Sequence, residues 1–217
     1  MQIIRMGSRV CRLYVPEGPG PWPLAVVCGG GLETLAEGRP RAVLLGLEAE
    51  GGRDFTPWPA PGLGETAFTG QAGRYLEELL GRALPEAARH APLSGRRAIL
   101  GYSLGGLFAL WALLEGAPFA RAASLSGSLW YDGWLDHLAG RLPAPGPEVY
   151  LSLGKAEEHG GPRRMRAVGD TTRVTAALLS GALGEGAVTL AWNRGGHFTG
   201  IPTRWQRGLA WALDGWR

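Results

Sequence analysis

Short apolar runs alternate with longer segments of helical periodicity along most of this sequence. The strand-like runs cover residues 9–15, 24–29, 42–48, 97–102, 122–127, 148–154 and 188–193. Segments with a helical spacing of apolar residues lie at about 70–86, 104–116, 166–183 and 203–216. Such alternation is typical of an α/β fold, in which helices cover both faces of a parallel sheet. We therefore expect a mostly parallel central sheet flanked by helices.

The length of the chain sets the number of domains that we expect. With 217 residues, of which 45% are hydrophobic, the chain can bury one substantial core. No internal repeat or linker interrupts it, and we predict a single domain over residues 1–217. Residues 51–70 form the longest stretch without regular periodicity. The stretch fits a plain surface loop or, because long loops are often functional and it holds Arg53, Asp54 and Trp58, a functional one.

Charge and composition restrict the partners of this chain. The net charge is +3, but the arginines are scattered, and the densest group, PRRMR at 162–166, is better explained as the start of a helix than as a nucleic-acid patch. No apolar run approaches membrane-spanning length, and the N-terminus does not resemble a signal peptide, so we expect a cytoplasmic protein with no nucleic-acid or membrane partner. Cys11 and Cys28 lack metal or redox spacing, which predicts buried, reduced thiols. The nine tryptophans would allow an aromatic homodimer interface, although no residue specifies one.

One serine stands between glycines where a strand-like run meets a helix-like one, in the segment AILGYSLGGLFALWALL. Gly101 to Gly105 spell G-x-S-x-G, the pattern of a tight strand-to-helix turn that exposes a nucleophilic hydroxyl. The dipole and free amides of the following helix would stabilise an oxyanion beside Ser103. Alternatively, Ser103 is an ordinary N-cap residue of that helix.

A serine hydroxyl needs a base, most often a histidine. Of the four histidines, His197 follows the last strand-like run in a glycine-rich turn, where a loop could aim its ring at the serine. The others fit structural roles better, although His159 could serve either purpose. The order of serine first and histidine last is that of hydrolases with this motif.

A carboxylate should orient the histidine from the end of another strand. Glu157 and Glu158 directly follow the run at 148–154, and we predict Glu157, with Glu158 as the alternative. Weaker candidates either follow the preceding strand or lie within a helical pattern: Asp132, Asp136 and Asp170.

Two backbone amides should face the developing negative charge. One is the amide of Leu104, and the other should come from the glycines at 29–31, of which we choose Gly30. This glycine run lacks the features of a P-loop or a dinucleotide fingerprint. Because a serine hydrolase of this kind requires neither a metal nor an organic cofactor, we expect none.

Several pieces together resemble one family over most of residues 52–213. The pieces are GRDFTPWP, AILGYSLGGLFALW, SLSGSLWYDGW, LGKAEEHGGPRRMRAVGDTTRVTAALL and AWNRGGHFTGIPTRWQRGLAWAL. They are similar to the Putative esterase (esterase D-like) branch of the α/β hydrolases, which includes siderophore trilactone esterases and S-formylglutathione hydrolases. The resemblance implies an α/β-hydrolase fold with minimal or no lid, Ser103 as nucleophile and His197 as base. Because some members have a Ser-His dyad and CGGG replaces the family's usual Asp-Gly loop, neither the acid nor the oxyanion glycine is fixed by it.

Aromatic and basic side chains near these motifs are candidates for substrate contacts. SGSLWYDGW should bring Trp130 and Tyr131 beside the serine, unless they pack in the core. Arg53 could steer an anionic substrate towards the site.

These observations predict a serine carboxylic-ester hydrolase that forms an acyl-enzyme on small acyl, aryl or siderophore-type esters. The same residues would also serve an acyltransferase or a peptidase, because pocket shape and water access choose the acceptor. A non-catalytic binding protein of the same fold is the third possibility.

Overall fold

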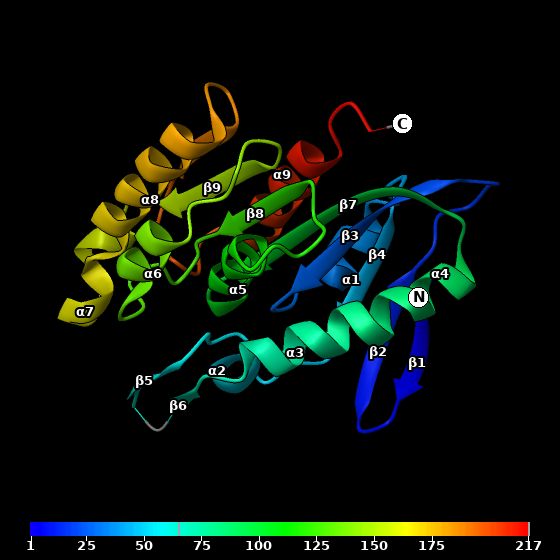
Figure 1. Cartoon of the computed structure of the whole chain (residues 1–217), viewed down its shortest axis with the longest axis horizontal. Helices are drawn as coiled ribbons and strands as arrows, with labels where there is room; N and C mark the ends of the chain where they lie inside the picture. Colours follow the sequence, from blue (N-terminus) through cyan, green and yellow to red (C-terminus); the bar gives the residue numbers. More distant parts are fainter. Residues whose placement is uncertain (65, 217) are drawn as a thin grey trace.

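A central mixed sheet organises the computed structural model, which describes residues 1–64 and 66–216 (Figure 1). Within these residues eight strands form one sheet, in the order β1-β2-β4-β3-β7-β8-β9-β10. Their bounds are β1 Gln2–Met6, β2 Arg9–Tyr14, β3 Trp22–Cys28, β4 Val43–Leu47, β7 Leu93–Tyr102, β8 Arg121–Leu125, β9 Glu148–Gly154 and β10 Val188–Asn193.

Strand direction agrees with the sequence expectation. Strands β4, β3, β7, β8, β9 and β10 are parallel, and β1 and β2 join one edge in antiparallel pairing. Every residue of β3 is buried, which explains its continuous apolar sequence, because strands covered on both faces lose the usual polar alternation. The predicted mostly parallel sheet is confirmed.

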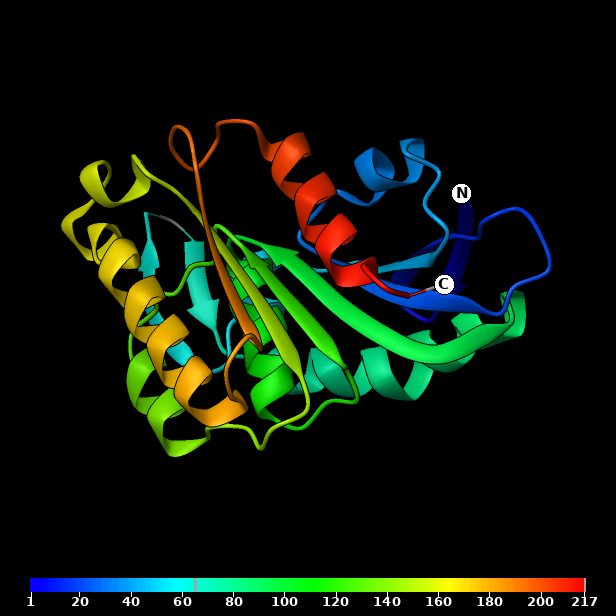
Figure 2. The ribbon, with the colours of Figure 1, turned by 90° about the horizontal axis from the view of Figure 1, so that it is seen from above.

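Helices cover both faces of the sheet (Figure 2). One face is covered by α1 (Leu32–Glu37) and α9 (Ile201–Leu213), with Leu35, Trp205 and Leu209 buried against the strands. The other carries the larger core, under a π-helical turn (Leu79–Ala83) and the helices α3 (Ala72–Glu78), α4 (Leu84–His90), α5 (Leu104–Leu114), α6 (Trp134–Gly140) and α8 (Val168–Leu183). Helix α5 is buried almost all round because it is apolar on every side.

The region expected to be a loop contains regular structure. It holds the short helix α2 (Gly51–Asp54) and a separate hairpin of β5 (Pro59–Leu63) and β6 (Thr66–Thr69). Strand β1 was also missed, because its pattern is largely exposed at the sheet edge. Prolines and glycines interrupt the alternation of apolar and polar residues in the hairpin, so no strand pattern is visible in the sequence. Contacts with distant residues hold it, such as those of Arg164 with the Pro61 carbonyl and of Trp130 with Phe68.

The carboxyl ends of β7, β8, β9 and β10 meet at one edge of the sheet. Parallel strands bring the residues after them together there, which is where open α/β sheets bind ligands. Cys11 and Cys28 are free, buried thiols, as expected. In the described part of the chain, no helix has the length and apolar character needed to cross a membrane.

Candidate active site

Ser103 occupies a strained turn between β7 and α5. Its φ of 57° and ψ of −122° lie outside the backbone conformations that residues other than glycine favour. The turn is possible because its neighbours are glycines: a Cβ on Gly101 would overlap the Gly105 backbone, and a Cβ on Gly105 would overlap the Cys28 backbone. The G-x-S-x-G pattern therefore reflects close backbone approach.

The hydroxyl of Ser103 does not cap the helix that follows. Ser103 stands at the N-cap position, but its side chain makes no capping hydrogen bond. Its Oγ lies instead 3.1 Å from Nε2 of His197. The backbone supplies the helix contacts, since the amides of Gly106 and Leu107 donate to the Ser103 carbonyl. An ordinary N-cap role does not account for this orientation.

His197 lies in the loop between β10 and α9, between Ser103 and a carboxylate. Its Nδ1 is 2.8 Å from Oε2 of Glu157, which follows β9 at the start of a 3₁₀ turn (Glu157–His159). With the Nδ1 proton donated to Glu157, Nε2 can accept the proton of the Ser103 hydroxyl. The structure thus brings the three residues together in one chain of hydrogen bonds.

Glu157 is held on both of its oxygens. Its side chain is only 5% exposed, and Oε1 accepts hydrogen bonds from the Gly154 amide at 2.7 Å and from Ser126 Oγ at 2.8 Å. Burial opposes ionisation of this carboxyl, but the hydrogen bonds, from His197 first, outweigh it and hold the pKa of Glu157 below its usual range. Glu157 is therefore an anion at neutral pH.

The alternative acid does not reach the histidine ring in this arrangement. The carboxylate of Glu158 pairs with Arg173 from α8, at 2.8 Å and 2.9 Å. That pairing lowers the pKa of Glu158 and directs it away from the Ser103 to His197 axis. The geometry thus favours Glu157.

Two residues that sequence reasoning missed also support the site. Arg204, from the first turns of α9, is 2% exposed, and its Nη1 donates to Oε1 of Glu157 at 2.8 Å while its Nη2 donates to the Gly196 carbonyl at 2.8 Å. The hydroxyl of Tyr102 donates to the carbonyl of His197. No local pattern marks either residue, because their partners lie far away in the sequence.

A cavity of about 370 Å³ lies beside His197. It is lined by the loops after β8, β9 and β10, by Pro162 and by side chains of α7 (Arg163–Arg166) and α8. Its side walls are mostly apolar: Trp130, Met165, Val168 and Phe198. This is the size and character of a small-molecule site.

The glycine loop after β3 runs along the opposite side of the Ser103 turn. Gly29, Gly30 and Gly31 all have positive φ, from 84° to 88°. An ideal Cβ on Gly29 would lie 3.0 Å from the Tyr102 carbonyl, whereas one on Gly30 would meet nothing within 4 Å. Gly29 therefore packs against the turn, and Gly30 faces open space.

Comparison with protein families decides the class. The model of the family described as Putative esterase matches residues 25–189, which is well over half of the chain. The chain belongs to this esterase family. Carboxylic-ester hydrolysis is therefore its class of activity. The match contains Ser103 and Glu157 but ends before His197, so the position of the histidine rests on the geometry above.

Solved structures share the α/β-hydrolase fold of this family member. A BES protein from Bacillus cereus is 21% identical with a TM-score of 0.76, over 97% of this chain and 95% of its own. The siderophore hydrolase EstB from Aspergillus nidulans is 20% identical with a TM-score of 0.70, over 96% and 91%. An IroE-like serine hydrolase from Shewanella oneidensis is 19% identical with a TM-score of 0.72, over 93% and 74%. The comparison with curated proteins found no match.

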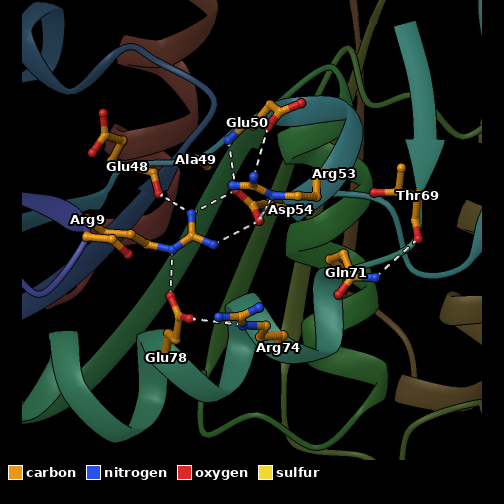
Figure 3. Close-up of a pocket in the computed structure, with 11 residues that line it drawn as sticks. Arg9, Glu48, Ala49, Glu50, Arg53, Asp54, Thr69, Gln71, Arg74 and Glu78 are labelled. Atoms are coloured by element: carbon orange, nitrogen blue, oxygen red, sulfur yellow. Dashed lines mark hydrogen bonds and ion pairs between the residues drawn. The ribbon is translucent and has the colours of Figure 1, made fainter.

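The structure does not bring Arg53 to the cavity beside His197. Arg53 lines a different hollow of about 690 Å³, formed by α2, α3 and the start of β2 (Figure 3). There its guanidinium pairs with Glu50 at 3.0 Å and Asp54 at 3.0 Å. The expectation that Arg53 steers an anionic substrate to Ser103 does not fit this position.

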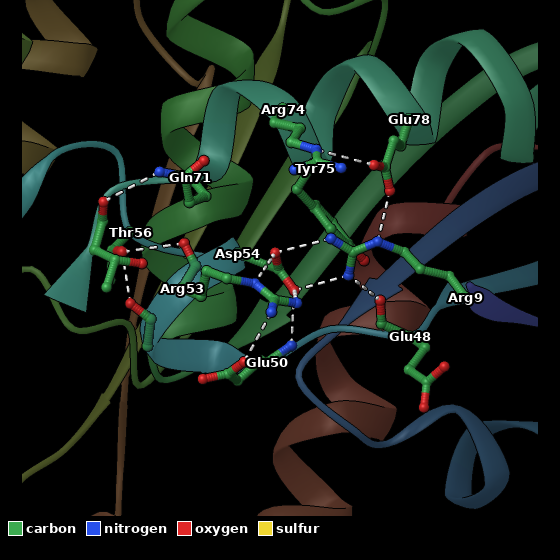
Figure 4. A network of polar contacts seen from close by, with 12 residues as sticks. Arg9, Glu48, Glu50, Arg53, Asp54, Thr56, Gln71, Arg74, Tyr75 and Glu78 are labelled. Atoms are coloured by element: carbon green, nitrogen blue, oxygen red, sulfur yellow. Dashed lines mark hydrogen bonds and ion pairs between the residues drawn. The ribbon is translucent and has the colours of Figure 1, made fainter. Parts of the chain in front are cut away.

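Asp54 is the centre of a network in that hollow (Figure 4). Its carboxylate is 1% exposed and accepts two hydrogen bonds from Arg9, at 2.8 Å and 2.9 Å, besides those from Arg53 and the Glu50 amide. Glu78 of α3 holds the other side of Arg9. These contacts join β2, α2 and α3, so the GRD of the sequence segment GRDFTPWP acts here in packing.

Of the two aromatic residues predicted to contact substrate, Trp130 and Tyr131, only Trp130 lines the cavity beside His197. Trp130 lines the cavity beside His197, whereas Tyr131 is 2% exposed and is not among the cavity-lining residues. The Tyr131 hydroxyl donates to the Trp58 carbonyl, and its ring packs on Trp58 and Phe68. Tyr131 therefore belongs to the core.

Metal ligands do not gather in the part of the chain that the structure describes. Residues 1–64 and 66–216 contain no group of three or more His, Cys, Asp and Glu side chains placed to hold a metal ion.

Proposed function

We propose that this family member is a serine carboxylic-ester hydrolase that works through an acyl-enzyme. The observation that carries the proposal is the chain of hydrogen bonds from Ser103 Oγ to His197 and from His197 to Glu157 at a strained strand-to-helix turn. Ser103 is the nucleophile, His197 the base, and Glu157 the carboxylate that orients the ring and stabilises its charged form.

The reaction has two proton-balanced steps. Ser103 Oγ bonds to the carbonyl carbon and gives its proton to His197 Nε2, which passes it to the departing alkoxide as the carbon–oxygen bond breaks. Water then attacks the acyl-enzyme, its proton passes through Nε2 to Ser103, and the free acid leaves. Both tetrahedral intermediates carry a negative oxygen.

The oxyanion donors in this proposal are the amides of Leu104 and Gly30. Leu104 is the first residue of α5, where amides have no intrahelical acceptor, and the helix dipole is favourable there. Gly30 supports the role because its positive φ and open surroundings leave room for a ligand oxygen. Small acyl, aryl and siderophore-type esters are the substrates to test, the last suggested by the name of EstB.

A fluorophosphonate probe tests the proposal directly. Intact mass spectrometry of the wild type should show one adduct, which Ser103→Ala abolishes and His197→Ala slows by about a thousandfold. Ser128→Ala is the matched control, since the Ser128 Oγ lies 3.4 Å from that of Ser103 yet contacts no base among the residues that the structure describes. No adduct on the folded wild type, or an adduct that survives Ser103→Ala, would contradict the proposal.

A further inference from the structure

The cavity beside His197 has walls suited to an uncharged group. Trp130, Met165, Val168 and Phe198 present apolar surface to it. Among the described residues that line it, none is a lysine or an arginine. Arg164, which packs over the Trp130 ring at 5.1 Å, is already paired with Asp132 at 2.8 Å. An anionic ligand would therefore find no free cation on these walls and would lie near the charged Glu157.

The chemistry fixes which half of an ester faces this cavity. His197 Nε2 must give its proton to the departing oxygen, so the alcohol half leaves on the side of the histidine ring. The ring of His197 is itself part of the cavity wall, together with loops that follow β8, β9 and β10. The glycine loop follows β3, on the other side of β7 in the sheet order. The departing oxygen and the cavity therefore share one side of Ser103.

Phe198 stands at the open edge of this cavity, with most of its ring exposed to solvent. Its side chain is 85% exposed, the most exposed of the large apolar residues in the described chain. Its ring stands edge-on to His197, with centroids 5.0 Å apart and planes at 89°. A phenylalanine in this position contributes little packing in the free protein but would lose solvent contact when an apolar group fills the cavity.

We propose that this cavity binds the alcohol half of the substrate and that this half is an uncharged aryl or similarly compact apolar group. The inference rests on the proposed function, because it assumes that His197 protonates the leaving group. In this proposal Trp130, Met165 and Phe198 contact the alcohol half and determine which alcohols fit.

A pair of isomeric esters tests the assignment. Benzyl butyrate carries its ring in the alcohol half, and the methyl ester of phenylbutanoic acid carries the ring at the far end of the acyl half. The two alcohols have similar acidity, so intrinsic reactivity hardly separates them. We expect kcat/KM to favour benzyl butyrate by about tenfold. A para-carboxybenzyl butyrate, with the same ring and a charge, should be at least about tenfold poorer than benzyl butyrate.

Phe198→Ala links the preference to the cavity. Because the side chain is exposed, its removal should leave the fold intact and lower the ratio between the isomers by about fivefold. Ile3→Ala, which removes another exposed apolar side chain on β1, should leave the ratio unchanged. If Phe198 only positioned His197, Phe198→Ala would slow hydrolysis of both esters equally, and the ratio of their kcat/KM values would stay the same.

The outcomes separate this inference from the proposed function. Hydrolysis of both isomers at equal rates, faster hydrolysis of the methyl ester, or a ratio unaffected by Phe198→Ala would each overturn the assignment of the cavity while leaving a serine esterase. A wild type without an adduct on Ser103 would overturn the proposed function instead.

Discussion

Arg204 donates a 2.8 Å hydrogen bond to Oε1 of Glu157, the carboxylate oxygen that does not face His197. The same guanidinium holds the carbonyl of Gly196, the residue before His197. One buried cation therefore positions both the carboxylate and the loop that carries the base. A carboxylate with partners on both oxygens cannot rotate away from the imidazole, which is the geometry that a histidine base requires.

Loss of this cation should weaken the fold as well as the site. We expect Arg204→Met to lower the free energy of unfolding by about 3 kcal/mol, because it leaves Glu157 buried without that partner. Urea denaturation at neutral pH measures it. Among residues 1–64 and 66–216, the exposed Arg207 on the same helix bonds only the Asn193 side chain, and Arg207→Met should cost less than about 1 kcal/mol. Equal effects of the two variants would show that the buried contacts contribute little.

Replacing the carboxylate that faces His197 should impair activity with little change in shape. Glu157→Gln keeps the size of the side chain but removes the charge that stabilises the protonated ring, so kcat/KM should fall by about a thousandfold. Steady-state hydrolysis of benzyl butyrate measures this. In Glu158→Gln the change should stay below about twofold, because that carboxylate pairs with Arg173. Similar losses in both variants would move the acid role away from Glu157.

The buried carboxylate of Asp54 should contribute to stability rather than to catalysis. Asp54→Asn removes the charge that Arg9 and Arg53 share, and we expect unfolding to become easier by about 2 kcal/mol. Glu50→Gln, at the exposed end of the same network, should cost less than about 1 kcal/mol. Urea denaturation measures the stability, and kcat of Asp54→Asn should stay near that of the wild type. A clear fall in kcat would show that this hollow is coupled to the active site and would contradict the prediction.

The contribution of Asp54 should disappear in acid. Burial opposes its ionisation, but hydrogen bonds from Arg9 and Arg53 outweigh that effect and hold its pKa well below the ordinary value of 3.8. A carboxyl with a lowered folded pKa stabilises the fold above its unfolded pKa, and this stability is lost as the pH falls through the folded pKa. The difference between wild type and Asp54→Asn should be constant from about pH 7 to 5 and shrink below about pH 4. A difference that stayed constant down to about pH 3 would contradict it.

Two glycines should respond in opposite ways to alanine. At Gly101 a Cβ would overlap the Gly105 backbone, so Gly101→Ala should lower the unfolding free energy by about 1–3 kcal/mol and disturb the Ser103 turn. At Gly181, exposed within α8, a Cβ meets nothing within 4 Å, and Gly181→Ala should raise stability by about 0.5–1 kcal/mol. Thermal denaturation and fluorophosphonate labelling of each variant measure both effects. Unimpaired labelling of Gly101→Ala would show that the turn tolerates the clash.

The parallel sheet was predictable, and Ser103, His197 and Glu157 could be proposed as candidates, because strands and the Ser103 turn leave local signals in the sequence. Apolar runs mark buried strands, glycines mark the turn at Ser103, and the residues after parallel strands must meet at one edge. The order of serine, acid and histidine then pointed to His197 and to Glu157, with Glu158 as the alternative, and the hydrogen bonds of the structure separate the two carboxylates. The strand and turn signals lie within a few residues of the groups that they identify, whereas the order of the three residues is read along the whole chain.

The supporting contacts were not predictable because they join distant segments. Arg204 reads as an ordinary charged residue of an amphipathic helix until the fold brings Glu157 to it. Arg53 has the sequence context of a site residue, yet Glu50 and Asp54 neutralise it in another hollow. From the sequence Tyr131 could equally belong to the core or to a pocket, and its burial and its hydrogen bond to Trp58, both products of the tertiary fold, place it in the core.

The place of α9 in the chain also fixes when the site is completed. His197 and Arg204 both follow β10, whereas Ser103 and Glu157 precede it. During synthesis Ser103 and Glu157 emerge before His197 and before Arg204, which holds Glu157. A chain interrupted after β10 would carry Ser103 without His197, the base in our proposal. If the proposed mechanism holds, hydrolysis should begin only once α9 has docked on the sheet, and activity would then report on that docking.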